Sequence, residues 1–232
     1  MRIAGIVKSS LIDYPQKAST VIFLGGCNFK CGYCHNPELL SLSEGDGRSH
    51  EYIKEDELFS FLQKRKRFID GVCISGGEPT LNRELPELIA KIKGLCLSIK
   101  LDTNGTNPTM LEELLGNKLI DYVAMDIKGP AMKYQEIAGN HVDLNIIKRS
   151  ANLLIEAYNK IKISCEFRTT VCREQLTKED LKMMISEHPS APPWFLQRFN
   201  NPGRILDEKG TYSAYSLEEM ELFGEELCVS VR

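Results

Sequence analysis

The sequence predicts an α/β protein, a partial (β/α)6 TIM-like barrel with a parallel sheet covered by helices. Short apolar segments of β type alternate six times with longer segments of helical periodicity. Such alternation implies parallel strands that are joined by crossover helices. The 232 residues suit one domain over 1–232, because α/β barrels often use this length as a single unit.

Each predicted unit pairs one strand with the helix that follows it. The pairs are 19–26 with 50–68, 71–75 with 81–95, 97–102 with 108–117, 122–127 with 144–159, 162–171 with 177–188, and 194–199 with 216–227. In the fifth helix, Thr177 and Asp180 supply a cap and a first-turn acid. Six units are fewer than the eight of a complete barrel, so we expect an open or incompletely closed ring.

Composition and charge exclude several classes of protein. The 29 Lys and Arg residues nearly balance 32 Asp and Glu, which gives no support to a nucleic-acid or membrane partner. The first 15 residues do not form a signal peptide, and no stretch reaches the roughly 18 apolar residues of a membrane span. We therefore expect a cytoplasmic protein with reduced thiols. Four cysteines with apolar neighbours are expected in the core: Cys73, Cys96, Cys165 and Cys228.

The segment "GGCNFKCGYCHN" (25–36) concentrates potential ligands, and three prosthetic groups match it. Cys31, Cys34 and His35 fit the C-x-x-C-H pattern of c-type haem, although that haem is normally attached outside the cytoplasm. Adding Cys27 gives a Cys₃His set for zinc, but His35 adjoins Cys34 and is badly placed to complete a tetrahedron. The third interpretation uses only the three cysteines, which would hold three irons of an iron–sulfur cluster and leave the fourth open to another ligand.

Polar residues follow the predicted strands, at the edge where parallel α/β proteins gather their chemistry. They are "GGEPT" (76–80), "DTNG" (102–105), "MDIK" (125–128), the face of Glu166, Arg168 and Thr170, and the pair Gln197 and Arg198. Each has an ordinary structural interpretation on its own. "DTNG" is a good turn, and "GGEP" suits a strand-to-helix turn with Pro79 at the helix start. Their joint placement favours one site.

The sequence resembles the radical S-adenosylmethionine (SAM) enzymes over nearly the whole chain. The resemblance rests on the spacing Cys27-x-x-x-Cys31-x-x-Cys34, on Tyr33 before the last cysteine, and on the "GGEP" box. Within that family it is closest to the glycyl-radical-enzyme activases. "SSLIDYP" (9–15) and the strand-end segments are similar to the short activating proteins of anaerobic ribonucleoside-triphosphate reductase, with Gln16 where glycine is expected.

The resemblance implies a cofactor set and a reaction. Cys27, Cys31 and Cys34 would bind one [4Fe–4S] cluster, and SAM would ligate the open iron. Reductive cleavage of SAM would yield a 5′-deoxyadenosyl radical that takes hydrogen from a glycine of a partner enzyme. The residues expected to bind the cofactor are Tyr33, Gly76, Gly77, Glu78, Asp102, Thr103, Asp126, Lys128, Arg168 and Gln197, with Asn200 as a further candidate.

Further expectations concern the partner enzyme, the electron donor, the face that the partner binds, and two alternative functions. The partner would be a glycyl radical enzyme, namely anaerobic ribonucleotide reductase, and the electron donor a flavodoxin or ferredoxin. To admit the partner's glycine loop, the site would open on a broad face formed by the strand ends and the segments 128–142 and 200–215. The alternatives are a radical SAM enzyme acting on a small molecule, as in deazaguanine biosynthesis, and a zinc or iron–sulfur binding module without catalysis.

Overall fold

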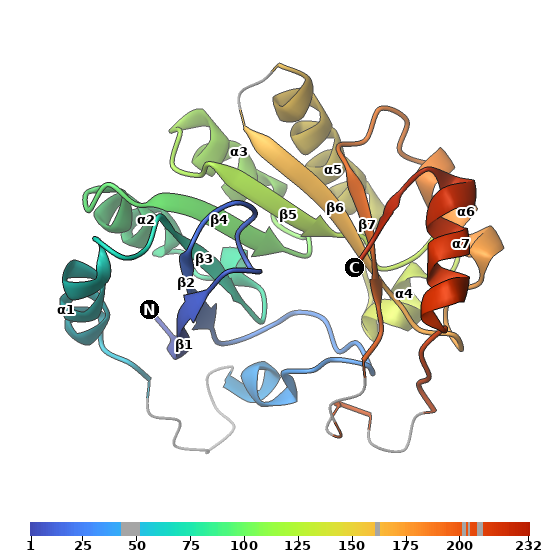
Figure 1. Ribbon diagram of the computed structural model, residues 1–232, viewed down its shortest axis with the longest axis horizontal. Helices are drawn as coiled ribbons and strands as arrows, with labels where there is room; N and C mark the ends of the chain where they lie inside the picture. The colour runs from blue at the N-terminus through green and yellow to red at the C-terminus, as the bar shows by residue number, and fades with distance from the viewer. Residues whose placement is uncertain (43–51, 161–162, 201–202, 204, 208–210) are drawn as a thin grey trace.

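The computed structural model describes residues 1–42, 52–160, 163–200, 203, 205–207 and 211–232. Its centre is one eight-stranded sheet in the order β1 to β8, with helices along the outer side (Figure 1). The strands are β1 (Ile3–Ser10), β2 (Ser19–Leu24), β3 (Gly71–Gly76), β4 (Ser98–Thr103), β5 (Tyr122–Asp126), β6 (Ser164–Val171), β7 (Trp194–Arg198) and β8 (Ser230–Val231). Every neighbouring pair after β1–β2 is parallel, which confirms the predicted α/β class.

Seven helices and two short 3₁₀ segments connect the described strands. They are η1 (Pro37–Leu42), α1 (Glu55–Arg65), η2 (Pro79–Leu81), α2 (Leu85–Lys93), α3 (Pro108–Gly116), α4 (Tyr134–Ala138), α5 (Leu144–Asn159), α6 (Lys178–Ser186) and α7 (Leu217–Leu227). The cap and first-turn acid predicted for α6 together form a capping box, because Thr177 and Asp180 bond to each other's backbone nitrogens. Positions 50 and 51 of the first predicted helix, and position 162 of the fifth strand, lie outside the described residues.

The six predicted pairs of strand and helix are present, and the sheet has two further strands, β1 and β8, that were not predicted. Strand β1 lies at the edge of the sheet and pairs antiparallel with β2. Because only Ile3 of this strand is fully buried, its sequence lacks the alternation of apolar and polar residues that predicts a half-buried strand. Strand β8 has two residues and helix α4 has five, which is too short for a periodic signal. Within the described ranges, no helix combines the length and the apolar character needed to cross a bilayer.

The alternation of side chains gives the sheet two different faces. On β4, Ile99 and Leu101 are fully buried in the apolar core. Lys100 and Asp102 point to the opposite, enclosed face, because successive strand residues point to opposite sides. The enclosed face is therefore polar. At the carboxyl ends of the strands it continues into the loops that follow them.

Two of the four cysteines expected in the core do lie there. Cys73 and Cys165 are buried, as predicted. The prediction was wrong for Cys96 and Cys228, which are exposed. Both adopt left-handed backbone conformations, with φ of 62° and 54°, just beyond the ends of helices α2 and α7. The turns that end these helices carry the cysteines out to solvent.

Candidate functional site at the carboxyl ends of the strands

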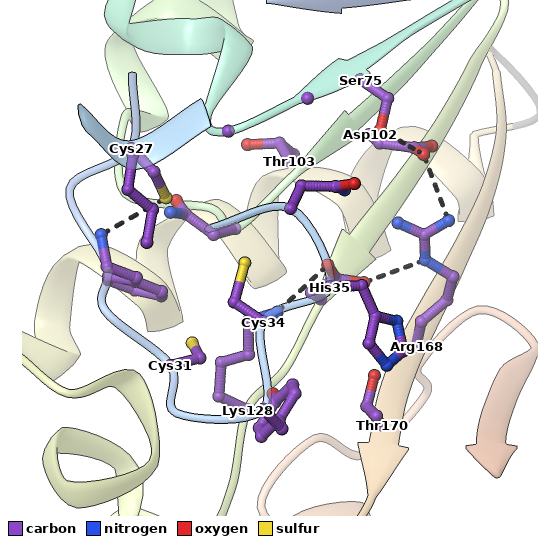
Figure 2. Close-up of a pocket in the computed structure, with 18 residues that line it drawn as sticks. Cys27, Cys31, Cys34, His35, Ser75, Asp102, Thr103, Lys128, Arg168 and Thr170 are labelled. Carbon is purple, nitrogen blue, oxygen red and sulfur yellow. Dashed lines mark hydrogen bonds and ion pairs between the residues drawn. The ribbon is translucent and has the colours of Figure 1, made fainter. Parts of the chain in front are cut away.

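The loop after β2 directs three cysteines toward one cavity. Figure 2 shows Cys27, Cys31 and Cys34 around a common space at the end of the sheet. The other lining residues are Phe29, Tyr33, His35, Asn36, Leu40, Ser75, Gly76, Gly77, Asp102, Thr103, Asn104, Asp126, Lys128, Arg168 and Thr170. Most of the polar groups predicted at the ends of β3, β4, β5 and β6 thus meet the cysteines at one site. Glu78 and Glu166 are not among the lining residues, and the Glu166 carboxylate instead bonds to Tyr122 and Arg232.

Hydrogen bonds hold the cysteine loop against the turn after β4. The Asn28 amide donates to Thr106 Oγ1 at 2.9 Å and accepts from the Asn104 amide at 2.9 Å. The backbone carbonyl of Asn28 accepts from the Asn140 amide at 2.8 Å. Because Asn28 directly follows Cys27, this network sets the position of the first cysteine.

A segment before α7 packs against the other end of the cysteine loop, near Gly32 and Cys34. The backbone nitrogens of Leu206 and Asp207 donate to the carbonyls of Cys34 and Gly32 at 3.2 and 3.0 Å. A Cβ at Gly32 would lie 1.9 Å from the Tyr212 hydroxyl, so only glycine permits this contact. The described part of segment 200–215 therefore packs on the cysteine loop. Residues 201–202, 204 and 208–210 of that segment lie outside the described residues.

The two glycines of the "GGEP" box bring β3 against the start of the cysteine loop. Gly76 has φ of 122°, and a Cβ there would lie 2.3 Å from the Leu24 carbonyl oxygen. A Cβ at Gly77 would lie 2.1 Å from the Gly26 carbonyl oxygen. Both positions require glycine because of this close backbone approach. They leave backbone, and no side chain, on that wall of the cavity.

The Glu78 carboxylate points into the protein, away from the cavity. Its Oε1 accepts from the Thr80 backbone and hydroxyl and from Thr103 Oγ1 at 2.8 Å, and its Oε2 accepts from the Asn104 nitrogen at 2.6 Å. Burial raises the pKa of Glu78, although these bonds favour the charged form. In the structure Glu78 ties the "GGEP" box to the "DTNG" turn. Its expected contact with SAM stays a prediction.

Five charged side chains form a ladder across β4, β5 and β6, which we call the charge ladder: Lys100, Asp102, Arg168, Asp126 and Lys128. Lys100 bonds to Oδ1 of Asp102, and Arg168 Nη1 lies 3.3 Å from Oδ2 of the same carboxylate. Arg168 Nε bonds to Asp126 Oδ1 at 2.9 Å, and Lys128 Nζ to Asp126 Oδ2 at 3.2 Å. The signs alternate from one end to the other. Figure 2 shows Asp102, Arg168 and Lys128 of the ladder at the cavity.

The two carboxylates of the charge ladder, Asp102 and Asp126, stay ionised at neutral pH. Burial alone would raise the pKa of Asp126, but Arg168 and Lys128 together outweigh it and lower the pKa to about 2. The pKa of Asp102 is lowered in the same way, by Arg168 and Lys100 against the effect of burial. Three cations and two anions leave one net positive charge, which favours an anionic ligand in the cavity.

The three cysteine thiols are better suited to bind an iron–sulfur cluster than to ionise without a metal beside them. Burial raises the pKa of Cys27 to about 12, and it also raises the pKa values of Cys31 and Cys34. The thiolates that a metal requires are therefore stable only beside a strong positive charge, and cluster irons would supply it. Three soft donors on one cavity are the ligand set of such a cluster.

The zinc interpretation finds no support in the arrangement of the ligands. In the described part of the chain, no three His, Cys, Asp or Glu side chains are grouped to hold a single metal ion. His35, which would be the fourth zinc ligand, stacks on Phe199 with ring centroids 5.6 Å apart. A four-iron cluster needs its thiolates further apart, because each one binds a different iron.

The remaining predicted residues divide into two groups. Tyr33 lines the cavity, is buried, and has a hydroxyl without a hydrogen-bond partner among the described residues. Gln197 and Asn200 are not among the residues that line the cavity, so their roles stay predictions. Sequence reasoning missed Ser75 and Lys100. Ser75 lies two residues before Gly77, and Lys100 two residues before Asp102. Because every second residue of a strand points to the same side, this spacing could have indicated both residues.

The fold and this site define an enzyme that uses an iron–sulfur cluster and SAM. The chain belongs to the radical SAM superfamily, whose family model matches residues 21–186, and this family uses a [4Fe–4S] cluster and SAM.

Among the curated relatives, a Methanocaldococcus jannaschii protein provisionally named a glycyl-radical enzyme activating enzyme is 40% identical over 208 residues. The alignment covers 89% of this chain and 83% of that protein. The pyruvate formate-lyase-activating enzyme of Clostridium pasteurianum is 35% identical over 135 residues, covering 55% of this chain and 52% of that protein.

Solved structures support the fold. The crystal structure of Streptococcus suis SuiB bound to S-adenosylmethionine matches with a TM-score of 0.62 at 17% identity. The match covers 89% of this chain and 47% of that chain, so this chain spans about half of its length. At this level of identity the likeness establishes the partial barrel and nothing about substrate.

Proposed function

We propose that this protein is a glycyl-radical-enzyme activase that cleaves SAM reductively and abstracts hydrogen from a glycine of a partner enzyme. The observation that carries the proposal is the cavity itself, where three cysteines face the cations Lys128 and Arg168 of the charge ladder. When bound, the cluster supplies the electron that cleaves the SAM sulfonium to methionine and a 5′-deoxyadenosyl radical.

The residues of the cavity have distinct roles in this proposal. Cys27, Cys31 and Cys34 hold three irons. The bare backbone at Gly76 and Gly77 admits the amino end of the methionine moiety. Lys128 is the cation best placed for the SAM carboxylate, because it lies at the free end of the charge ladder and lines the cavity.

The adenosyl side of SAM would lie against the ends of β4, β5 and β6. Asp102, Thr103, Asp126 and Arg168 line that part of the cavity. Tyr33 contributes a buried aromatic face from the cysteine loop, with a hydroxyl that no other described residue bonds. These groups bind and orient SAM, and they exclude water from it.

The names of two relatives support a protein substrate. The M. jannaschii protein is provisionally named, and the C. pasteurianum protein is named, as an activating enzyme. We propose anaerobic ribonucleotide reductase as the partner and a flavodoxin or ferredoxin as the electron donor. Both would act in the cytoplasm, where thiols stay reduced.

The first experiment is anaerobic reconstitution with iron and sulfide. We expect about four irons per chain, and near zero in the triple Cys27→Ala, Cys31→Ala, Cys34→Ala variant. The exposed Cys96 and Cys228 provide the matched control, because their alanine variants should retain all the iron. Full iron content in the triple variant would rule out the assigned ligands.

The second experiment tests the reaction. The reconstituted protein, SAM, a reductant and the cognate anaerobic ribonucleotide reductase should give a glycyl doublet in the electron paramagnetic resonance spectrum of the reductase. Lys128→Ala should weaken SAM binding and leave the iron content unchanged. If SAM is cleaved but no glycyl radical enzyme from the same cell acquires the doublet, the small-molecule alternative is correct.

A further inference from the structure

A lysine below the cavity is buried among charged and polarisable groups. Lys100 is 2% exposed and is one of the largest fully enclosed side chains among the described residues. Its Nζ bonds to Asp102 Oδ1, lies 3.8 Å from Cys73 Sγ, and stands 5.8 Å from the centre of the Tyr122 ring. A lysine is almost never fully buried unless it is paired, so its position requires an explanation.

Lys100 does not line the cavity, but Asp102 does. The two oxygens of Asp102 have separate partners. Oδ1 bonds to Lys100, while Oδ2 accepts from Ser75 Oγ at 3.1 Å and faces Arg168 Nη1 at 3.3 Å. Lys100 therefore fixes the rotation of the carboxylate that contacts Arg168.

Arg168 is shared between two carboxylates on either side of it. Its Nε bonds to Asp126 at 2.9 Å, and its Nη1 faces Asp102 at the longer distance. If Asp102 lost Lys100, Arg168 would be its only cationic partner and would be drawn toward it. The bond from Arg168 to Asp126 would weaken, and the Asp126–Lys128 end of the ladder would change with it.

Lys100 also decides the net charge of the charge ladder. With Lys100 there are three cations and two anions, and without it the charges cancel. The surplus positive charge lies in a region of low dielectric, where it acts over a longer range than in water.

We infer that Lys100 is a positioning residue for SAM binding. It orients Asp102, and through it Arg168, for SAM binding from below the cavity, and its positive charge favours a reduced cluster. The inference rests on the proposed binding of SAM in this cavity.

The test uses the reconstituted protein and S-adenosylhomocysteine as a stable probe. Lys100→Met keeps the length of the side chain and removes the charge. We expect its affinity for the probe, measured by calorimetry, to fall on the order of tenfold, the effect of one charge-assisted hydrogen bond. We also expect the midpoint potential of the cluster to become more negative, with unchanged iron content.

Two further variants separate this role from a loss of stability. Lys93→Met removes a lysine from a more exposed ion pair, with Asp121, and should change neither quantity. In an Asp102→Asn background, Lys100→Met should alter probe affinity less than twofold, because Lys100 then has no carboxylate to orient. This double variant also provides the measurement if Lys100→Met alone fails to fold.

The outcomes distinguish the inference from the proposed function. If the native protein does not bind the probe, the SAM site itself is wrong. If the native protein binds it and Lys100→Met keeps either native affinity or native potential, only the role of Lys100 is wrong. A full-sized loss of affinity in the Asp102→Asn background would likewise contradict orientation through Asp102.

Discussion

Arg168 and Asp126 are direct neighbours on adjacent parallel strands, and Arg168 Nε lies 2.9 Å from Asp126 Oδ1. The pair joins β5 to β6 at the wall of the cavity. Lys128 bonds to the other oxygen of Asp126, so this carboxylate has a cation on each side. The arrangement stabilises the ionised form of Asp126, with consequences for the pH dependence of stability.

The pKa of Asp126 is about 2 in the folded chain against 3.8 for a free carboxyl. A lowered carboxyl pKa stabilises the fold above the unfolded value, and this stabilisation is lost as pH falls from about 4 to about 2. Asp126→Asn removes the titrating group. The gap in free energy of unfolding between native and variant chains should therefore shrink by about 2 kcal/mol on acidification from about pH 5 to about pH 2.

Denaturant titrations of the apoprotein across that range measure this gap. Glu112→Gln is the control, because Glu112 and Arg149 form an ion pair in which both side chains are more than half exposed. A constant gap for Asp126→Asn would show that Arg168 and Lys128 do not stabilise the carboxylate.

Glu78→Gln should destabilise the protein by about 2 kcal/mol. The two carboxylate oxygens accept from Thr80, Thr103 and the Asn104 nitrogen, and an amide would direct its NH₂ group at one of these donors. Thermal or denaturant unfolding followed by circular dichroism measures the loss. Glu84→Gln, at an exposed carboxylate paired with the N-terminal amine, should have little effect. Equal stability of both variants would contradict the buried network.

Asn28→Ala should loosen the cysteine loop. It removes the side-chain bonds to Thr106 and Asn104, at a cost of about 1–2 kcal/mol, and the reconstituted variant should lose iron to a chelator faster than the native protein. Asn140→Ala removes only a partly exposed bond to the Asn28 carbonyl and should have a smaller effect. Chelation rates that rank the two variants the other way would contradict this role of Asn28.

Gln16→Gly should stabilise the protein by about 0.5–1 kcal/mol. Gln16 lies in the turn between β1 and β2 with φ of 62°, a conformation that costs a residue with a Cβ about 1 kcal/mol. Gln16→Ala keeps the Cβ and should give no gain. Unfolding midpoints of the three chains decide the matter, and a gain from alanine instead of glycine would contradict the backbone argument.

The sequence alone was enough to predict the class of fold, most of the helices and the residues around the cavity. The spacing of Cys27, Cys31 and Cys34, the capping of α6 and the order of strands and helices are local patterns that reflect backbone geometry over a few residues. The family resemblance led us to expect glycine at position 16, and Gln16 has the positive φ of 62° that glycine adopts readily. These features do not depend on the rest of the chain.

Tertiary structure decided the relationships between distant segments. Lys100 meets Cys73 and Tyr122, and Glu78 meets Asn104, only because parallel pairing brings β3, β4 and β5 together in one register. The sequence of a "GGEP" box is the same whether its carboxylate faces a ligand or, as here, the interior. The direction of its side chain depends on which hydrogen-bond donors surround it after folding, and two of them, Thr103 and Asn104, come from the end of β4 and the turn after it.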